Sequence, residues 1–110
     1  MDIETARTTL LLEYSCEEYD HFGKPAYRLG PKKHGGKPGR TFVTLWIEEG
    51  FAVLMLNLDQ QTVLVEEHSG KFEPHPSKWG QKGATIMHLA KVDKALFTEA
   101  VSLAYEHAKR

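Results

Sequence analysis

The chemistry most evident in this sequence is anion binding by a basic loop at residues 30–40. The loop contains four glycines and two prolines, which disfavour regular structure. Lys32, Lys33 and Lys37, followed by Arg40, add positive charge, and exposed backbone N–H groups also contact phosphates. The sequence therefore predicts either a contact with an anion or a nucleic acid, or simply a solvated hairpin tip whose lysines keep a sheet edge soluble.

A second loop, at residues 72–85, combines two prolines and two glycines with Trp79, Lys78 and Lys82. An indole can stack on any nucleobase, which contributes about 1 to 3 kcal/mol per base, while nearby lysines hold phosphates. The alternative is architectural, because a tryptophan between a proline-rich turn and a strand often closes the end of a core. We expect Trp79 to have the second role.

Catalytic and metal chemistry have weaker support. Glu17, Glu18, Asp20 and His21 carry groups suited to metal binding or acid–base work, but adjacent residues point in different directions, and we expect a solvated acidic turn. Cys16 has no oxyanion motif near it and is expected to be a small buried group. The six histidines are not paired with cysteines at zinc-type spacing. The sequence therefore marks no catalytic residue, metal site or cofactor.

Three helices are expected to hold these loops in place. The clearest begins at an Asp93 cap and continues to about residue 108, with apolar residues at helical spacing. A second is expected over residues 60–68, after an Asp59 cap and before Gly70. The N-terminal segment predicts a third, which starts near residue 3 and ends near residue 15 or 16.

Strands account for the rest of the pattern. The predicted strands are residues 25–29, 41–47, 51–56 and 84–89. The middle two flank a three-residue loop that ends in Gly50, typical of an antiparallel hairpin, and we place this hairpin at the centre of the sheet. Its aromatic residues are expected in the core: Phe42, Trp46 and Phe51. The order of elements predicts one α+β domain over residues 1–110, with an antiparallel sheet of about four strands and three helices on one face.

Composition limits the function classes. The chain has 110 residues, 41% of them hydrophobic, and a net charge of −1, which fits one globular domain and lacks the basic excess of a dedicated nucleic-acid binder. The charge is uneven, because residues 1–23 hold six acids and one base whereas residues 24–40 hold six bases and no acid. A single cysteine, the lack of a long apolar run and a start without a basic leader predict a cytoplasmic protein with no membrane contact.

Short motifs follow one another along nearly the whole chain. They are Phe22-Gly23-Lys24-Pro25-Ala26-Tyr27-Arg28, Arg40-Thr41-Phe42-Val43-Thr44-Leu45, the apolar strand at 51–56, Phe72-Glu73-Pro74, Trp79-Gly80, Gly83-Ala84-Thr85, and Val92-Asp93 through Ala104-Tyr105. In this order and spacing they resemble the MmcQ/YjbR-like family of small bacterial proteins. The resemblance implies a compact domain similar to the double-wing fold, for which DNA binding has been suggested, and no agreed catalytic residues. The chain departs from the family pattern at residues 30–39, where relatives have a short glycine–lysine turn.

Two hypotheses of different classes result. The first is a non-enzymatic binding domain, a monomer or weak dimer, that contacts DNA through Lys32, Lys33, Lys37, Arg40, Lys78 and Lys82. The second is a protein-interaction or small-ligand module with an apolar pocket near Trp79. An enzyme that uses the acidic segment at residues 17–21 ranks last. The distribution of charge over the folded surface would discriminate between the first two.

Overall fold

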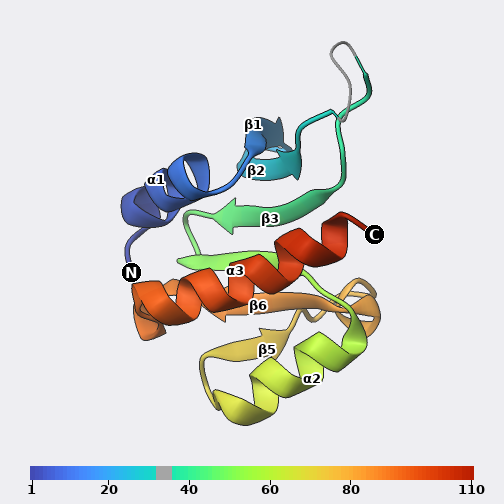
Figure 1. The fold of residues 1–110 in the computed structure, drawn as a ribbon. Coiled ribbons are helices and arrows are strands. Elements are labelled where there is room, and N and C mark those ends of the chain that lie inside the picture. Colours follow the sequence, from blue (N-terminus) through green and yellow to red (C-terminus); the bar gives the residue numbers. More distant parts are fainter. Residues whose placement is uncertain (32–35) are drawn as a thin grey trace.

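The computed structural model describes residues 1–31 and 36–110, which form one α+β domain (Figure 1). Lys32, Lys33 and His34 of the basic loop lie outside the described residues. The three helices are α1 (Ile3–Glu13), α2 (Leu58–Glu67) and α3 (Lys94–Ala108). The strands are β1 (Cys16–His21), β2 (Lys24–Leu29), β3 (Thr41–Trp46), β4 (Phe51–Met55), β5 (Phe72–Pro74) and β6 (Ala84–His88), with single 3-10 turns at η1 (Gly80–Lys82) and η2 (Leu89–Lys91).

The six strands form one antiparallel sheet in the order β1-β2-β3-β4-β6-β5. The β3–β4 hairpin lies at its centre, as predicted, but the expectation of about four strands is wrong. The acidic segment expected to be a turn is β1, an edge strand paired with β2 from Cys16 to His21. Its charged residues lack the apolar alternation by which a strand is recognised in a sequence. Charged side chains are nevertheless common on exposed sheet edges. The other missed strand, β5, has only three residues.

The helices cover one face of the sheet. All three contribute to the main core, in which α3 packs against β3 and β4 (Figure 1). The largest fully buried side chains of this core include Tyr27, Phe42, Leu54, Met87 and Phe97. The opposite face carries a smaller cluster, formed by Val53, Ala84 and Ile86 with the partly buried Trp46 and Phe51 packed against it. Of the three aromatic residues expected in the core, only Phe42 is fully buried.

The helix ends agree with the predictions to different degrees. Asp93 caps α3, with its Oδ1 accepting a hydrogen bond from the Leu96 N–H at 2.8 Å. The cap of α2 is Asn57 rather than Asp59, because Asn57 and Gln60 form a reciprocal capping box. Helix α1 ends at Glu13, two to three residues earlier than expected, since Tyr14 is already extended and leads into β1.

A bulge between β2 and β3 decides which side chains reach the open face. Tyr27 pairs with Val43 and Arg28 pairs with Thr41, which leaves Phe42 as an extra residue. Both Phe42 and Val43 therefore belong to the helix-covered core, and Thr41 lines the open face together with Thr44 and Trp46.

Candidate ligand-binding cleft

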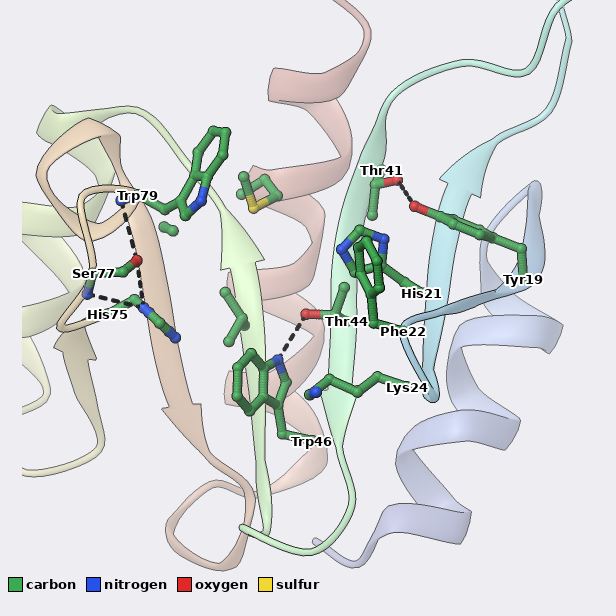
Figure 2. Close-up of a pocket in the computed structure, with 13 residues that line it drawn as sticks. Tyr19, His21, Phe22, Lys24, Thr41, Thr44, Trp46, His75, Ser77 and Trp79 are labelled. Carbon is green, nitrogen blue, oxygen red and sulfur yellow. Dashed lines mark hydrogen bonds between the residues drawn. The ribbon is translucent and has the colours of Figure 1, made fainter.

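The open face of the sheet contains an apolar cleft with a volume of about 460 Å³. Figure 2 shows residues from three segments around it. The β1–β2 hairpin supplies Tyr19, His21, Phe22 and Lys24, the central strands supply Thr41, Thr44, Trp46, Val53 and Met55, and the 75–84 segment supplies His75, Ser77, Trp79 and Ala84. The volume lies within the range of small-molecule sites, which are mostly apolar with a few polar groups.

Trp79 forms one wall of the cleft and is not the core plug expected from the sequence. Its side chain is 62% exposed, and Figure 2 shows it beside the cleft. The backbone around it is held firmly, because the Trp79 N–H donates to Ser77 Oγ at 3.2 Å and the Trp79 carbonyl accepts from the Ala84 N–H at 2.9 Å. A large indole is therefore presented to solvent from an ordered loop.

Two glycines allow this loop to pack closely against the rest of the domain. A Cβ at Gly80 would lie 1.7 Å from the His75 carbonyl oxygen, and a Cβ at Gly83 would lie 1.9 Å from the Leu56 carbonyl oxygen. Gly83 also has a φ of 120°, which side chains rarely adopt. These glycines fix the position of the backbone that carries Trp79.

Gln61, a buried residue of α2, ties the same loop to the helix layer. Its Nε2 donates to the carbonyl oxygens of Gly80 and Ala84, both at 3.0 Å, and to Thr85 Oγ1 at 3.1 Å. Each of these acceptors would lose a buried partner without the amide, which is costly in a protein interior. The Trp79 loop is thus anchored from the covered side of the sheet.

His75 presents a hydrogen-bond donor to the cleft. Its Nδ1 accepts from the Ser77 N–H at 3.2 Å and contacts Ser77 Oγ at 2.8 Å. Since Nδ1 is the acceptor, the proton of the neutral ring is on Nε2. The imidazole stands 5.4 Å from the Trp46 ring between centroids, and Figure 2 shows Nε2 directed toward Trp46.

Trp46 forms the second aromatic wall. Its Nε1 donates to Thr44 Oγ1 at 3.1 Å, and its ring packs against Phe51 with 5.3 Å between centroids. The Lys24 ammonium lies 4.4 Å from the centroid of the same ring, a cation–π contact. Trp46 is therefore held at its polar atom and by ring contacts with Phe51 and Lys24.

The β1–β2 hairpin forms the side of the cleft opposite Trp79. The Tyr19 hydroxyl hydrogen-bonds to Thr41 Oγ1, and the Arg28 guanidinium lies 4.4 Å from the centre of the Tyr19 ring. At the tip, Phe22 and Gly23 form a two-residue turn with φ values of 53° and 84°. Phe22 is 87% exposed. A left-handed conformation is strained at a bulky residue, and such strain clusters at functional sites.

None of the acidic residues of β1 lines the cleft. Glu18 accepts from Arg7 Nε and Nη2, both at 2.8 Å, and from the Tyr27 hydroxyl at 2.6 Å. The hydrogen bond from Arg7 holds the pKa of Glu18 below its usual value, whereas burial and the neighbouring Glu18 raise the pKa of Tyr27. Glu17 lies 3.7 Å from Arg28 Nε. Within residues 1–31 and 36–110, no three potential metal ligands come together.

The predicted nucleic-acid contacts divide into two groups. Lys37 and Arg40 line a second groove, also of about 460 Å³, with Lys109 and Arg110. Lys78 and Lys82 are exposed on either side of Trp79 in the chain, and Lys82 Nζ is 5.7 Å from its ring centre. Thr41, which follows Arg40, lines the same cleft as Trp79, so both groups lie toward one end of the sheet. Lys32 and Lys33 are outside the described residues.

The second hypothesis placed an apolar pocket near Trp79, and Trp79 does line the cleft, but the other walls were not predicted from the sequence. Trp46 was assigned to the core, Lys24 and His75 were given no role, and Tyr19 was treated as part of an acidic turn. One available signal was the β3–β4 hairpin, which is apolar on both faces although the predicted helices cover only one.

Comparisons with protein-family models, curated proteins and solved structures found no match to this chain. No helix among the described residues has the length and apolar character needed to cross a membrane.

Proposed function

We propose that this protein is a binding domain whose ligand lies in the cleft between Trp46 and Trp79. One observation carries the proposal: the open sheet face holds two indoles and an apolar floor that no element of the described chain covers. Removal of such apolar surface from water by a ligand lowers the free energy by about 25 cal/mol per Å². An ordered cleft also binds at low cost, because its side chains are already fixed before a ligand arrives.

The chain supplies its own probes for a test. Both of its tryptophans line the cleft, so quenching of intrinsic fluorescence reports ligand occupancy directly. A set of small aromatic and aliphatic compounds is titrated into the full chain, and hits are checked by thermal shift, since a ligand that binds only the folded state raises Tm.

The expected result is saturable quenching by aromatic compounds, weakened at least about tenfold by Trp79→Ala, with unfolding temperature nearly unchanged because the indole is exposed. Leu12→Ala is the matched control, since Leu12 is another exposed apolar side chain, 79% accessible and outside the cleft lining. Equal affinity of the Trp79→Ala variant and the unmodified protein would overturn the proposal.

A second candidate function is nucleic-acid binding at the basic end of the sheet. The resemblance to the MmcQ/YjbR-like family, itself a proposal, suggests DNA as the partner. The observation in its favour is that Lys37 and Arg40 share a groove with Lys109 and Arg110. In residues 1–31 and 36–110, none of the ion pairs involves Lys37, Arg40, Lys78 or Lys82.

This second candidate predicts a strong dependence on salt. Binding of a labelled DNA duplex, followed by fluorescence anisotropy, should weaken steeply as salt is added, because phosphate contacts release counterions. The double change Lys37→Ala and Arg40→Ala should flatten that slope, whereas Lys71→Ala, in the connection before β5, should not. An absence of binding at low salt would rule out this function.

A further inference from the structure

We infer that the ligand of the cleft is a flat aromatic compound with one anionic group, a carboxylate or a phosphate monoester, which pairs with Lys24. This inference deepens the proposed function and rests on it. It concerns the chemical class of the ligand, which follows from the charges and the ring positions around the cleft.

The lining of the cleft is rich in donors and free of acids. Of the thirteen lining residues, all within the described chain, none is Asp or Glu, one is Lys and two are His. His75 Nε2 adds a donor directed toward Trp46, since Nδ1 is occupied by Ser77. A site with this set of groups favours negative charge and disfavours a cation, which would meet no counterion.

The protein already occupies the places where a cationic ligand would bind. Aromatic rings attract cations at their faces, but Lys24 Nζ lies 4.4 Å from the centre of Trp46 and Lys82 Nζ lies 5.7 Å from the centre of Trp79. A cationic ligand would have to displace these ammonium groups and would be repelled by them. The two indoles are therefore not a cage for a quaternary or primary amine.

Lys24 itself is the best partner for an anion. It is only partly exposed, and among the described residues it forms no ion pair. Figure 2 shows its ammonium beside Trp46 at the edge of the cleft. A partly desolvated ammonium with no carboxylate partner gains more from an arriving anion than an exposed lysine does, because screening by water is weaker there.

The walls favour a ring over an aliphatic chain. Trp46, Trp79 and Tyr19 all line the cleft, and His75 adds a ring 5.4 Å from Trp46. Aromatic pairs gain stabilisation beyond their buried area when they stack with an offset or meet edge to face. A flat ring over the floor of Val53 and Met55 can make such contacts with the side chains around it.

The test uses probes with one ring system and different charges. Naphthoate, naphthyl phosphate, neutral naphthamide and cationic naphthylmethylamine are titrated into the full chain, with tryptophan fluorescence or calorimetry as the measurement. The anions should bind at least about tenfold more tightly than the amide, and the amine should bind most weakly. Comparison of naphthoate with naphthyl phosphate shows which anionic group the site prefers.

Variants of Lys24 test whether this residue causes the preference for anionic ligands. Lys24→Met keeps an apolar stem over Trp46 and should lower naphthoate affinity about tenfold, to that of the amide, while amide binding is unchanged. Lys24→Arg should retain the preference for anions, and Lys71→Met is the control for loss of a distant positive charge. Retention of the full preference for naphthoate by a folded Lys24→Met protein would overturn the inference.

The outcomes separate the two levels of the proposal. Equal binding of naphthoate and naphthamide to the unmodified protein would contradict the anionic ligand and leave the aromatic cleft intact. Failure of every ring probe to bind would contradict the proposed function, and this inference with it.

Discussion

Single side chains decide what the cleft can recognise. The sequence places Trp46 in the core because both faces of its hairpin are apolar, and Trp79 because a tryptophan between a proline-rich turn and a strand often closes the end of a core. Local sequence does not reveal that one face of the sheet stays uncovered. On this face Trp46 is partly buried and Trp79 is 62% exposed. Lys24 likewise acquires its role only through its place 4.4 Å from Trp46.

The environment of Glu18 predicts how the free energy of unfolding depends on pH. Its folded-state pKa is lowered, first by the hydrogen bonds from Arg7 and then by the one from Tyr27. A carboxyl with a depressed pKa adds stability above its unfolded value, near 4.5, and this contribution is lost as the pH falls through the folded value. Because the pair with Arg7 is partly exposed, Glu18→Gln should lower the free energy of unfolding at pH 7 by about 1 kcal/mol.

The measurement is urea unfolding between about pH 7 and pH 3. Stability should fall less steeply with acidification in Glu18→Gln than in the unmodified protein. Glu66→Gln, which changes an exposed glutamate of α2, should leave the steepness as it is. If both variants followed the same curve, the ion pair would not contribute to folding.

At the scale of elements, the strongly periodic or capped segments are the ones that sequence predicts. Helix α3 begins at Asp93 and the β3–β4 hairpin turns at Gly50, as expected. Strand β1 was missed because Glu17, Glu18 and Asp20 are poor strand formers, and their cost is offset by contacts far along the chain or on the next strand, such as those of Glu18 with Arg7 and Tyr27. Tertiary contacts of this type cannot be read from local pattern.

At the β1–β2 turn, Phe22 is expected to lower the stability of the fold while it contributes to ligand binding. Phe22 has a φ of 53°, where a side chain such as Phe is strained and Asn is tolerated. Phe22→Asn should therefore raise the free energy of unfolding by about 1 kcal/mol, because little buried area is lost from a ring that is 87% exposed. The same change should weaken naphthoate binding severalfold, since it removes a side chain that lines the cleft.

Phe22→Ala separates the two effects. It removes the ring but keeps a residue that disfavours the left-handed conformation, so binding should weaken without a gain in stability. Thermal unfolding and fluorescence titration of both variants provide the comparison. A loss of stability in Phe22→Asn would show that the exposed ring stabilises the fold rather than serving the cleft.

At the scale of the whole molecule, the domain has one covered face and one open face. The helices bury the main core on one side, and the other side keeps a small apolar cluster of Val53, Ala84 and Ile86 at the base of the cleft. The sequence predicted the α+β class and the helices on one face. It placed an apolar pocket near Trp79 in one of its two hypotheses, but it did not predict the other walls of the cleft, because they come from segments that only the six-stranded sheet brings together.

The most direct test of a ligand-binding cleft is a nitrogen–proton NMR titration that follows the two indole N–H signals. These signals belong to Trp46 and Trp79 and report the two aromatic walls separately. On addition of naphthoate, both are predicted to shift and to saturate at the same ligand concentration, while the backbone amides of α1, on the covered face, stay in place. Unchanged indole signals, or shifts confined to residues outside the cleft, would contradict binding between Trp46 and Trp79.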